Sequence, residues 1–194
     1  MPRLLLAVFA VALAACGAGA PDPQPFEGAF TVAAPGPDTT LVSFETTGED
    51  AETGTAVVVD AADAATTRWD LGLLGTQVFL NGGSSGPGGA VGTVVDVAFD
   101  AVADALADDY VYRRDGESPC PTGPPRAVCT GDGDGLFRTV GEAVEPVPGR
   151  TLLLRLGDGQ GYAEVAVEAY DAATATYTLR YRVNPDGSSF QVDA

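Results

Sequence analysis

The clearest pattern of apolar and polar positions lies near the C-terminus, in three segments separated by turn-forming residues. The segments are 150–156, 162–169 and 176–183, and each has apolar side chains at every second position. Alternation with a period of two is typical of a β-strand that buries one face. The pattern therefore predicts an antiparallel meander of three strands.

Charged side chains occupy the opposite faces of the last two segments. Glu164 and Glu168 lie in one segment, and Arg180 and Arg182 lie in the next. Side chains of opposite charge stabilise neighbouring antiparallel strands when they face each other. We therefore expect these four side chains to pair on a solvated face of the sheet.

Shorter apolar segments upstream predict further strands at 41–46, 55–59, 69–74, 77–80 and 91–99. Two segments rich in Ala and Asp, 60–67 and 100–109, are expected to form short helices or solvated loops. No internal repeat and no interdomain linker is found downstream of the Pro-rich segment that ends at residue 25. The sequence predicts one all-β, mostly antiparallel domain over 26–194.

The first sixteen residues have the pattern of an export leader. Arg3 precedes an uninterrupted apolar run over 4–13, which is shorter than the roughly 20 residues of a membrane-spanning helix. The following Leu-Ala-Ala-Cys tetrapeptide resembles a bacterial lipobox. This resemblance implies a signal peptide over 1–15, a lipidated Cys16 and a membrane anchor. Gly17 stands where inner-membrane lipoproteins typically carry Asp, which implies the outer membrane, on its surface or its periplasmic face.

The segment after the leader predicts a tether and leaves two cysteines for the domain. Gly and Pro dominate 17–25, so residues 16–25 are expected to form an extended link between the anchor and the domain. Cys120 and Cys129 enclose a loop rich in Pro and Gly. In an exported chain such a pair is expected to form a disulfide, the alternative being two reduced thiols.

Charge and composition exclude several function classes. The chain of 194 residues has a formal net charge of −17, and it contains 10 arginines, no lysine and no histidine. Catalysis by a Ser-His-Asp triad, an imidazole metal site and a P-loop lysine are therefore excluded. Nucleic acid is a poor partner for so negative a chain. No carboxylate pair is singled out for hydrolysis, and we expect a protein that is not an enzyme.

An ordered set of motifs runs through the middle of the chain. Trp69-Asp70 is followed by Asn81-Gly82-Gly83 and Gly86, and then by a Phe-Asp pair at 99–100. The set ends with Tyr-Ala at 162–163 and a closing Tyr-x-Leu-Arg-Tyr strand. These motifs resemble, over 41–183, the HmuY family of exported haem-binding lipoproteins. The resemblance implies a β domain on a lipid anchor, haem as a ligand and an outer-membrane transporter as a partner.

The motif residues are interpreted first as a scaffold. Trp69 is expected to be buried with its indole N–H bonded, and Asp70 to cap backbone amides of the glycine turn. Asn81, Gly82 and Gly83 tolerate the backbone conformations of a tight turn. A direct role of these side chains in ligand binding is the alternative.

The resemblance does not supply ligands for haem iron. Family members bind haem through two axial His or Met side chains, between the glycine turn and the closing meander. Neither residue type occurs here in 101–148. Tyr can ligate haem iron, so Tyr110 and Tyr112 are candidate contacts, with Arg113 and Arg114 beside them for the propionates. Half-buried aromatics and arginines that balance neighbouring acids are the alternative.

A second candidate feature is the acidic loop around Asp132 and Asp134. Alternating Asp places oxygens on one side of a loop, but Glu142 lies at the wrong spacing for an EF-hand. Calcium binding and a solvated acidic loop both remain open.

Two hypotheses for the function follow. The first is a lipid-anchored, non-catalytic envelope protein that binds a ligand, with haem as a candidate cofactor held without His or Met. The second is a structural module, or a module that binds carbohydrate or protein, on the same scaffold. A concave pocket lined by Tyr and apolar groups, between the glycine turn and 101–148, would distinguish them.

Overall fold

The computed structural model describes most of the domain. The described residues are 25–47, 53–106, 110–117, 120–121, 123–130, 135–157, 161–185, 187 and 189–190. The signal peptide, Cys16, most of the tether and the Asp132/Asp134 pair lie outside them, so the expectations for these segments stay predictions. No helix among the described residues is long and apolar enough to cross a membrane.

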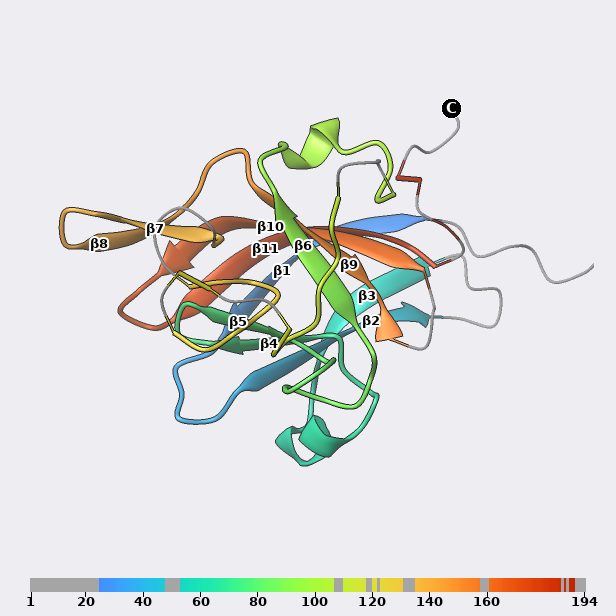
Figure 1. Cartoon of the computed structure of the whole chain (residues 1–194), viewed down its shortest axis with the longest axis horizontal. Helices are drawn as coiled ribbons and strands as arrows, with labels where there is room; N and C mark the ends of the chain where they lie inside the picture. The colour runs from blue at the N-terminus through green and yellow to red at the C-terminus, as the bar shows by residue number, and fades with distance from the viewer. Residues whose placement is uncertain are drawn as a thin grey trace, which may run out of the picture.

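The described chain forms two antiparallel sheets and a separate hairpin (Figure 1). A five-stranded sheet has the order β1-β11-β10-β9-β6, a four-stranded sheet has the order β3-β2-β4-β5, and β7 pairs with β8. The strands are β1 (Phe26–Ala33), β2 (Thr40–Thr47), β3 (Thr53–Val59), β4 (Leu71–Leu74), β5 (Gln77–Leu80), β6 (Val91–Val95), β7 (Phe137–Val140), β8 (Ala143–Pro146), β9 (Thr151–Arg155), β10 (Tyr162–Asp171) and β11 (Thr176–Asn184). The predicted all-β, mostly antiparallel fold is confirmed.

The C-terminal meander is confirmed in its register. Val165 of β10 lies opposite Tyr181 of β11 and Leu152 of β9, so the apolar positions of all three strands share one face. Both segments rich in Ala and Asp contain a short 3₁₀ helix, η1 (Ala61–Ala65) and η2 (Phe99–Ala101). Among the described residues of these segments, the predicted alternatives thus resolve to one short 3₁₀ helix each, joined to irregular chain.

Several strand boundaries differ from the expectation. Trp69 and Asp70 precede β4, and β6 ends at Val95 in place of residue 99. Beyond Val95 the chain turns away, and the Thr151 hydroxyl donates a hydrogen bond of 2.7 Å to the carbonyl of Val97. Thus a side chain of β9 takes the place of a continued strand ladder.

Three strands were not predicted, namely β1, β7 and β8. In β1, Gly28 interrupts the apolar pattern of the sequence. A Cβ atom at Gly28 would collide with the Tyr181 ring, so the missing side chain makes room for an aromatic of the next strand. The pairing of Gly28 with Tyr181 cannot be predicted from the sequence of β1 alone.

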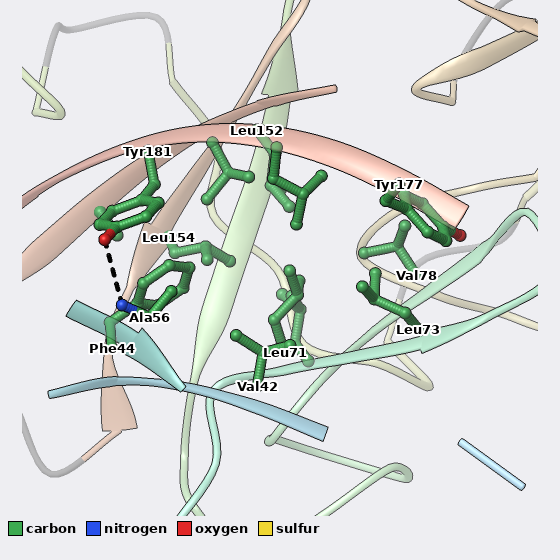
Figure 2. Close-up of a cluster of buried hydrophobic side chains, with 14 of the residues drawn as sticks. Val42, Phe44, Ala56, Leu71, Leu73, Val78, Leu152, Leu154, Tyr177 and Tyr181 are labelled. Carbon is green, nitrogen blue, oxygen red and sulfur yellow. Dashed lines mark hydrogen bonds between the residues drawn. The ribbon is translucent and has the colours of Figure 1, made fainter. Parts of the chain in front are cut away.

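Apolar side chains fill the space between the two sheets (Figure 2). The side chains are supplied by alternate positions of the strands, which is the reason for the period of two in the sequence. Contributors with 2% exposure or less include Val42, Leu71, Leu73, Val78, Leu80, Leu152, Leu154, Tyr177 and Leu179.

Two tyrosine hydroxyls of β11 cross this core and bond to the backbone of the opposite sheet. The amide of Ala56 in β3 donates a hydrogen bond of 3.1 Å to the Tyr181 hydroxyl (Figure 2). The Tyr177 hydroxyl donates to the carbonyl of Gly75, in the turn between β4 and β5. Both phenolic groups therefore satisfy buried backbone groups while their rings pack against apolar neighbours.

The other face of the five-stranded sheet is covered as well. A second apolar cluster consists of Val95, Val102, Ala105, Leu153 and Phe190, with three tyrosines packed against it. All described strands and both clusters lie between residues 26 and 190, so the chain from residue 26 onward contains the whole described domain.

We predict that Tyr181→Phe destabilises the domain although it keeps the aromatic ring. The change leaves the buried amide of Ala56 without its acceptor, and an unsatisfied buried group costs about 1–3 kcal/mol. Urea unfolding followed by tryptophan fluorescence measures the loss. Tyr170→Phe is the control, because this half-buried ring packs against Phe137 and Tyr177 through its carbon atoms. Equal effects in both variants would contradict the assigned role of the Tyr181 hydroxyl.

Candidate functional site

The side-chain amide of Asn81 organises the glycine turn. Asn81 is fully buried, and its Nδ2 donates to the carbonyls of Trp69 at 2.6 Å and Thr66 at 3.0 Å. Its Oδ1 accepts a hydrogen bond of 2.9 Å from the amide of Gly88. One side chain thereby joins the end of η1, the start of β4 and the far end of the turn.

The glycines of the turn are required by close backbone approach. A Cβ atom at Gly82 would collide with the carbonyl of Ala90, and one at Gly86 would collide with the Asn81 amide. Gly83 has a positive φ of 63° and lies against the carbonyl of Asp115. These positions therefore serve the packing of the turn.

Trp69 has the role expected of it, whereas Asp70 has a different one. Trp69 is 3% exposed, and its indole N–H donates a hydrogen bond of 3.2 Å to the carbonyl of Ala64. The expectation that Asp70 caps the glycine turn is wrong. Its Oδ2 accepts a hydrogen bond of 2.9 Å from the amide of Phe44 in β2, and the amide of Gly157 also bonds to it. Burial raises the pKa of Asp70 to about 6, against the effect of these amides.

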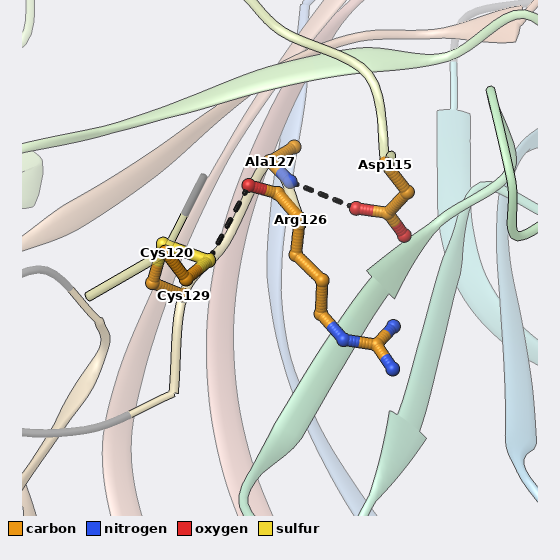
Figure 3. The surroundings of a disulfide bond; sticks show 5 residues. All are labelled: Asp115, Cys120, Arg126, Ala127 and Cys129. Atoms are coloured by element: carbon orange, nitrogen blue, oxygen red, sulfur yellow. Dashed lines mark hydrogen bonds between the residues drawn. A yellow bond between two sulfur atoms is a disulfide. The ribbon is translucent and has the colours of Figure 1, made fainter. Parts of the chain in front are cut away.

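Asp115 is a buried carboxylate that the sequence analysis does not single out as a site residue. It is 1% exposed, and its two oxygens accept from the amides of Leu80 at 3.0 Å and Ala127 at 2.9 Å. Its carbonyl accepts a hydrogen bond of 2.8 Å from the amide of Ser84. Asp115 thus fastens β5, the glycine turn and the 120–129 loop to one another. Figure 3 shows its bond to Ala127. The Asp-Gly pair that it begins is a common turn signal, and nothing else marks it in the sequence.

The disulfide between Cys120 and Cys129 is present, as predicted (Figure 3). The Cα atoms of the two cysteines lie 5.4 Å apart. A bridge that joins residues separated by 9 positions in the sequence stabilises a protein by roughly 2–3 kcal/mol on the chain-entropy model. The loop that it closes carries Pro124, Pro125 and Arg126.

A pocket of about 340 Å³ lies between the glycine turn and this disulfide loop. We call it the glycine-turn pocket. The guanidinium of Arg126 stacks over the ring of Phe79, with its carbon 4.0 Å from the ring centre. The lining residues are Thr39, Leu41, Ala64, Trp69, Phe79, Ser84, Ser85, Pro124, Pro125 and Arg126. The pocket lies between the glycine turn and residues of the 101–148 segment, and its aromatic lining residues are Trp69 and Phe79, with no Tyr among the described residues that line it.

The structure does not bring the candidate haem contacts into this pocket. Tyr110 and Tyr112 both pack against the second apolar cluster, whereas Arg113 and Arg114 are exposed. The Tyr112 hydroxyl donates a hydrogen bond of 2.7 Å to the carbonyl of Ala105. Burial also raises the pKa of Tyr112, which disfavours the phenolate that would ligate iron. These residues do not fit a haem-iron site.

The charged side chains of β10 and β11 form a covered cluster with η2. Arg182 lies opposite Glu164, as expected, with Nη1 2.7 Å from Oε1. The expectation of a solvated face is wrong at this point, because Glu164 is fully buried. Glu168 is exposed at a bulge of β10 and belongs to none of the ion pairs found among described residues.

The Phe-Asp motif at 99–100 explains how this cluster is covered. Asp100 pairs with Arg180 at 2.8 Å, and Arg182 also pairs with Glu27 of β1 at 3.1 Å. The ring of Phe99 lies under both guanidinium groups, 4.4 Å from the carbon of Arg180 and 5.0 Å from that of Arg182. Burial outweighs the nearby arginines and raises the pKa of Glu164 to about 7.

A further pocket of about 390 Å³ contains Asp70 together with Ser43, Glu45 and Arg68. Asp70 is held there by the backbone bonds given above, so we interpret it as part of the scaffold. No group of three or more His, Cys, Asp or Glu side chains is placed to bind a metal within the described part of the chain.

Comparison with known proteins finds similarity to solved structures. No protein-family model and no curated protein matches the chain. The chain is similar to a crystal structure from Bacteroides vulgatus that is described provisionally as an HmuY-like haem-binding protein. The two are 15% identical, with a TM-score of 0.43, over 82% of this chain and 92% of the other. Similarity at this level does not assign the chain to a family.

We predict that Glu164 makes the domain less stable as the pH rises through its folded pKa. Its pKa is about 7 in the folded state, above the ordinary 4.5, so the folded state binds the extra proton between these values. The unfolding free energy should therefore fall from about pH 4.5 to pH 7.5, by up to about 3 kcal/mol from this group.

Urea unfolding at a series of pH values measures this slope in the wild type and in Glu164→Gln. The Gln variant should lose the part of the slope that Glu164 contributes, whereas the exposed control Glu168→Gln should keep it. Identical slopes in the two variants would show that Glu164 titrates normally.

Proposed function

We propose that this chain is an exported, lipid-anchored envelope protein that binds a small ligand in the glycine-turn pocket without catalysing a reaction. The observation that carries the proposal is the pocket itself. It is concave, six of its ten lining residues are apolar, and it combines two aromatic side chains with one charged group. Ligand sites in proteins commonly have this composition.

The walls of the pocket are held by contacts that do not need a ligand. Asn81 and the indole of Trp69 bond to backbone carbonyls on one side, and Asp115 and the disulfide fasten the loop on the other. A preformed pocket of this kind binds without a large ordering cost. This favours ligand binding over a purely structural role for the same scaffold.

The leader and the disulfide support the proposed location. The lipobox at 13–16 and the Gly- and Pro-rich tether suit a protein held near a membrane by lipid. Disulfides persist in oxidising compartments outside the cytosol. On this proposal Cys16 carries the lipid, and the outer membrane is the site of anchoring. Delivery of the ligand to an outer-membrane transporter is the further step that the family resemblance suggests.

We predict that labelled palmitate is incorporated into the full chain expressed in a bacterial host, and that Cys16→Ala abolishes the label. The double variant Cys120→Ser/Cys129→Ser is the matched control and should keep the label, since its changes lie in the domain. A labelled Cys16→Ala variant, or an unlabelled wild type, would refute the anchor.

The proposal does not include haem whose iron is ligated by a side chain of the protein. The sequence has no histidine and Met1 is its sole methionine, and the Tyr112 hydroxyl is bonded to Ala105. A planar ligand that bears carboxylates would still agree with the proposal, since its carboxylates would suit Arg126.

We predict that haemin added to the chain from residue 26 onward keeps the Soret spectrum of haemin without an axial protein ligand. The measurement is a spectroscopic titration of the wild type and of Tyr110→Phe/Tyr112→Phe. A Soret shift that disappears in the double variant would show tyrosine ligation and would contradict our interpretation of Tyr112.

A further inference from the structure

We infer that the glycine-turn pocket is selective for small organic anions, with a carboxylate bound by Arg126 and an apolar ring seated beside Phe79 and the two prolines. This inference rests on the proposed function and specifies the ligand class of the same site.

The charge balance of the pocket is the first argument. Arg126 is the one charged side chain among the described residues that line it, in a chain with a net charge of −17. Five other arginines form the ion pairs found among the described residues, whereas Arg126 takes part in none of them. A cation without a carboxylate partner among the described residues, at the wall of a concave site, favours an anionic ligand.

The fixed position of the guanidinium is the second argument. The guanidinium carbon lies 4.0 Å over the centre of the Phe79 ring, and this cation–π contact positions a group whose N–H donors can serve a ligand. A carboxylate matches two of these donors at once. The hydroxyls of Ser84 and Ser85 line the same pocket and can donate further hydrogen bonds to the anion.

The remaining surface of the pocket suits a ring. Leu41, Ala64, Pro124 and Pro125 present apolar groups, while Trp69 contributes only an edge because it is 3% exposed. The position of Trp69 nevertheless provides a specific signal. It is the single tryptophan of the chain, so a change in tryptophan fluorescence reports on this pocket.

The test compares two probes of nearly equal shape, phenylacetate and the neutral phenylacetamide. Each is titrated into the chain from residue 26 onward while tryptophan fluorescence is recorded. We expect the Kd of phenylacetate to be lower by about tenfold, which corresponds to one charge-assisted contact.

Arg126→Gln should remove this difference, so that both probes bind with the Kd of the amide. Arg138→Gln is the matched control, because Arg138 lies on the exposed β7–β8 hairpin, where it pairs with Glu145, and is not among the residues that line the pocket. Urea unfolding of each variant verifies that it is folded.

Three results would overturn the inference. They are equal affinity of the wild type for both probes, an unchanged preference in Arg126→Gln, and no binding of either probe at concentrations on the order of 50 mM. Equal binding of both probes would retain the pocket as a binding site and reject its selectivity for anions. Palmitate labelling is independent of all three results, so failure here and failure of the proposed anchor can be told apart.

Discussion

The buried amide of Asn81 is the contact on which the arrangement of the site depends. A polar group removed from water must find partners in the protein, and Asn81 finds them in three separate stretches of backbone. The bonds fix where β4 begins, where η1 ends and how the glycine turn folds back. These positions in turn determine where Trp69 lies in the wall of the glycine-turn pocket. A hydrophobic side chain at residue 81 would leave all three backbone groups unsatisfied.

The five-stranded sheet is covered on both faces by quite different means. Apolar side chains join it to the second sheet, with two tyrosine hydroxyls bonded across the gap. On the outer face, η2 covers a buried glutamate and two arginines with Phe99 and Asp100. A buried ion pair contributes little net stability, but it strongly penalises any arrangement that separates its members. The segment η2 therefore has a defined position over the outer face of the sheet.

The sequence predicts more of the fold than of the site, because the strand pattern is local whereas the contacts of the site join residues far apart in the sequence. Alternation in the meander is a local property, so the strands and their shared face could be predicted from 150–183 alone. The burial of Glu164 depends on η2, which is distant in sequence, and the pattern of β10 carries no sign of it. Asp115 likewise has partners up to 35 residues away. The sequence alone could not predict which side chains line the pocket beside the glycine turn, because those distant bonds set the path of the 120–129 loop.

The disulfide has a consequence for when the pocket is completed. Pro124, Pro125 and Arg126 form one wall, and they lie between two cysteines that are joined only after oxidation. A newly made chain in a reducing compartment lacks that covalent closure. On the proposal above that the chain is exported, completion of this wall of the pocket would be coupled to export.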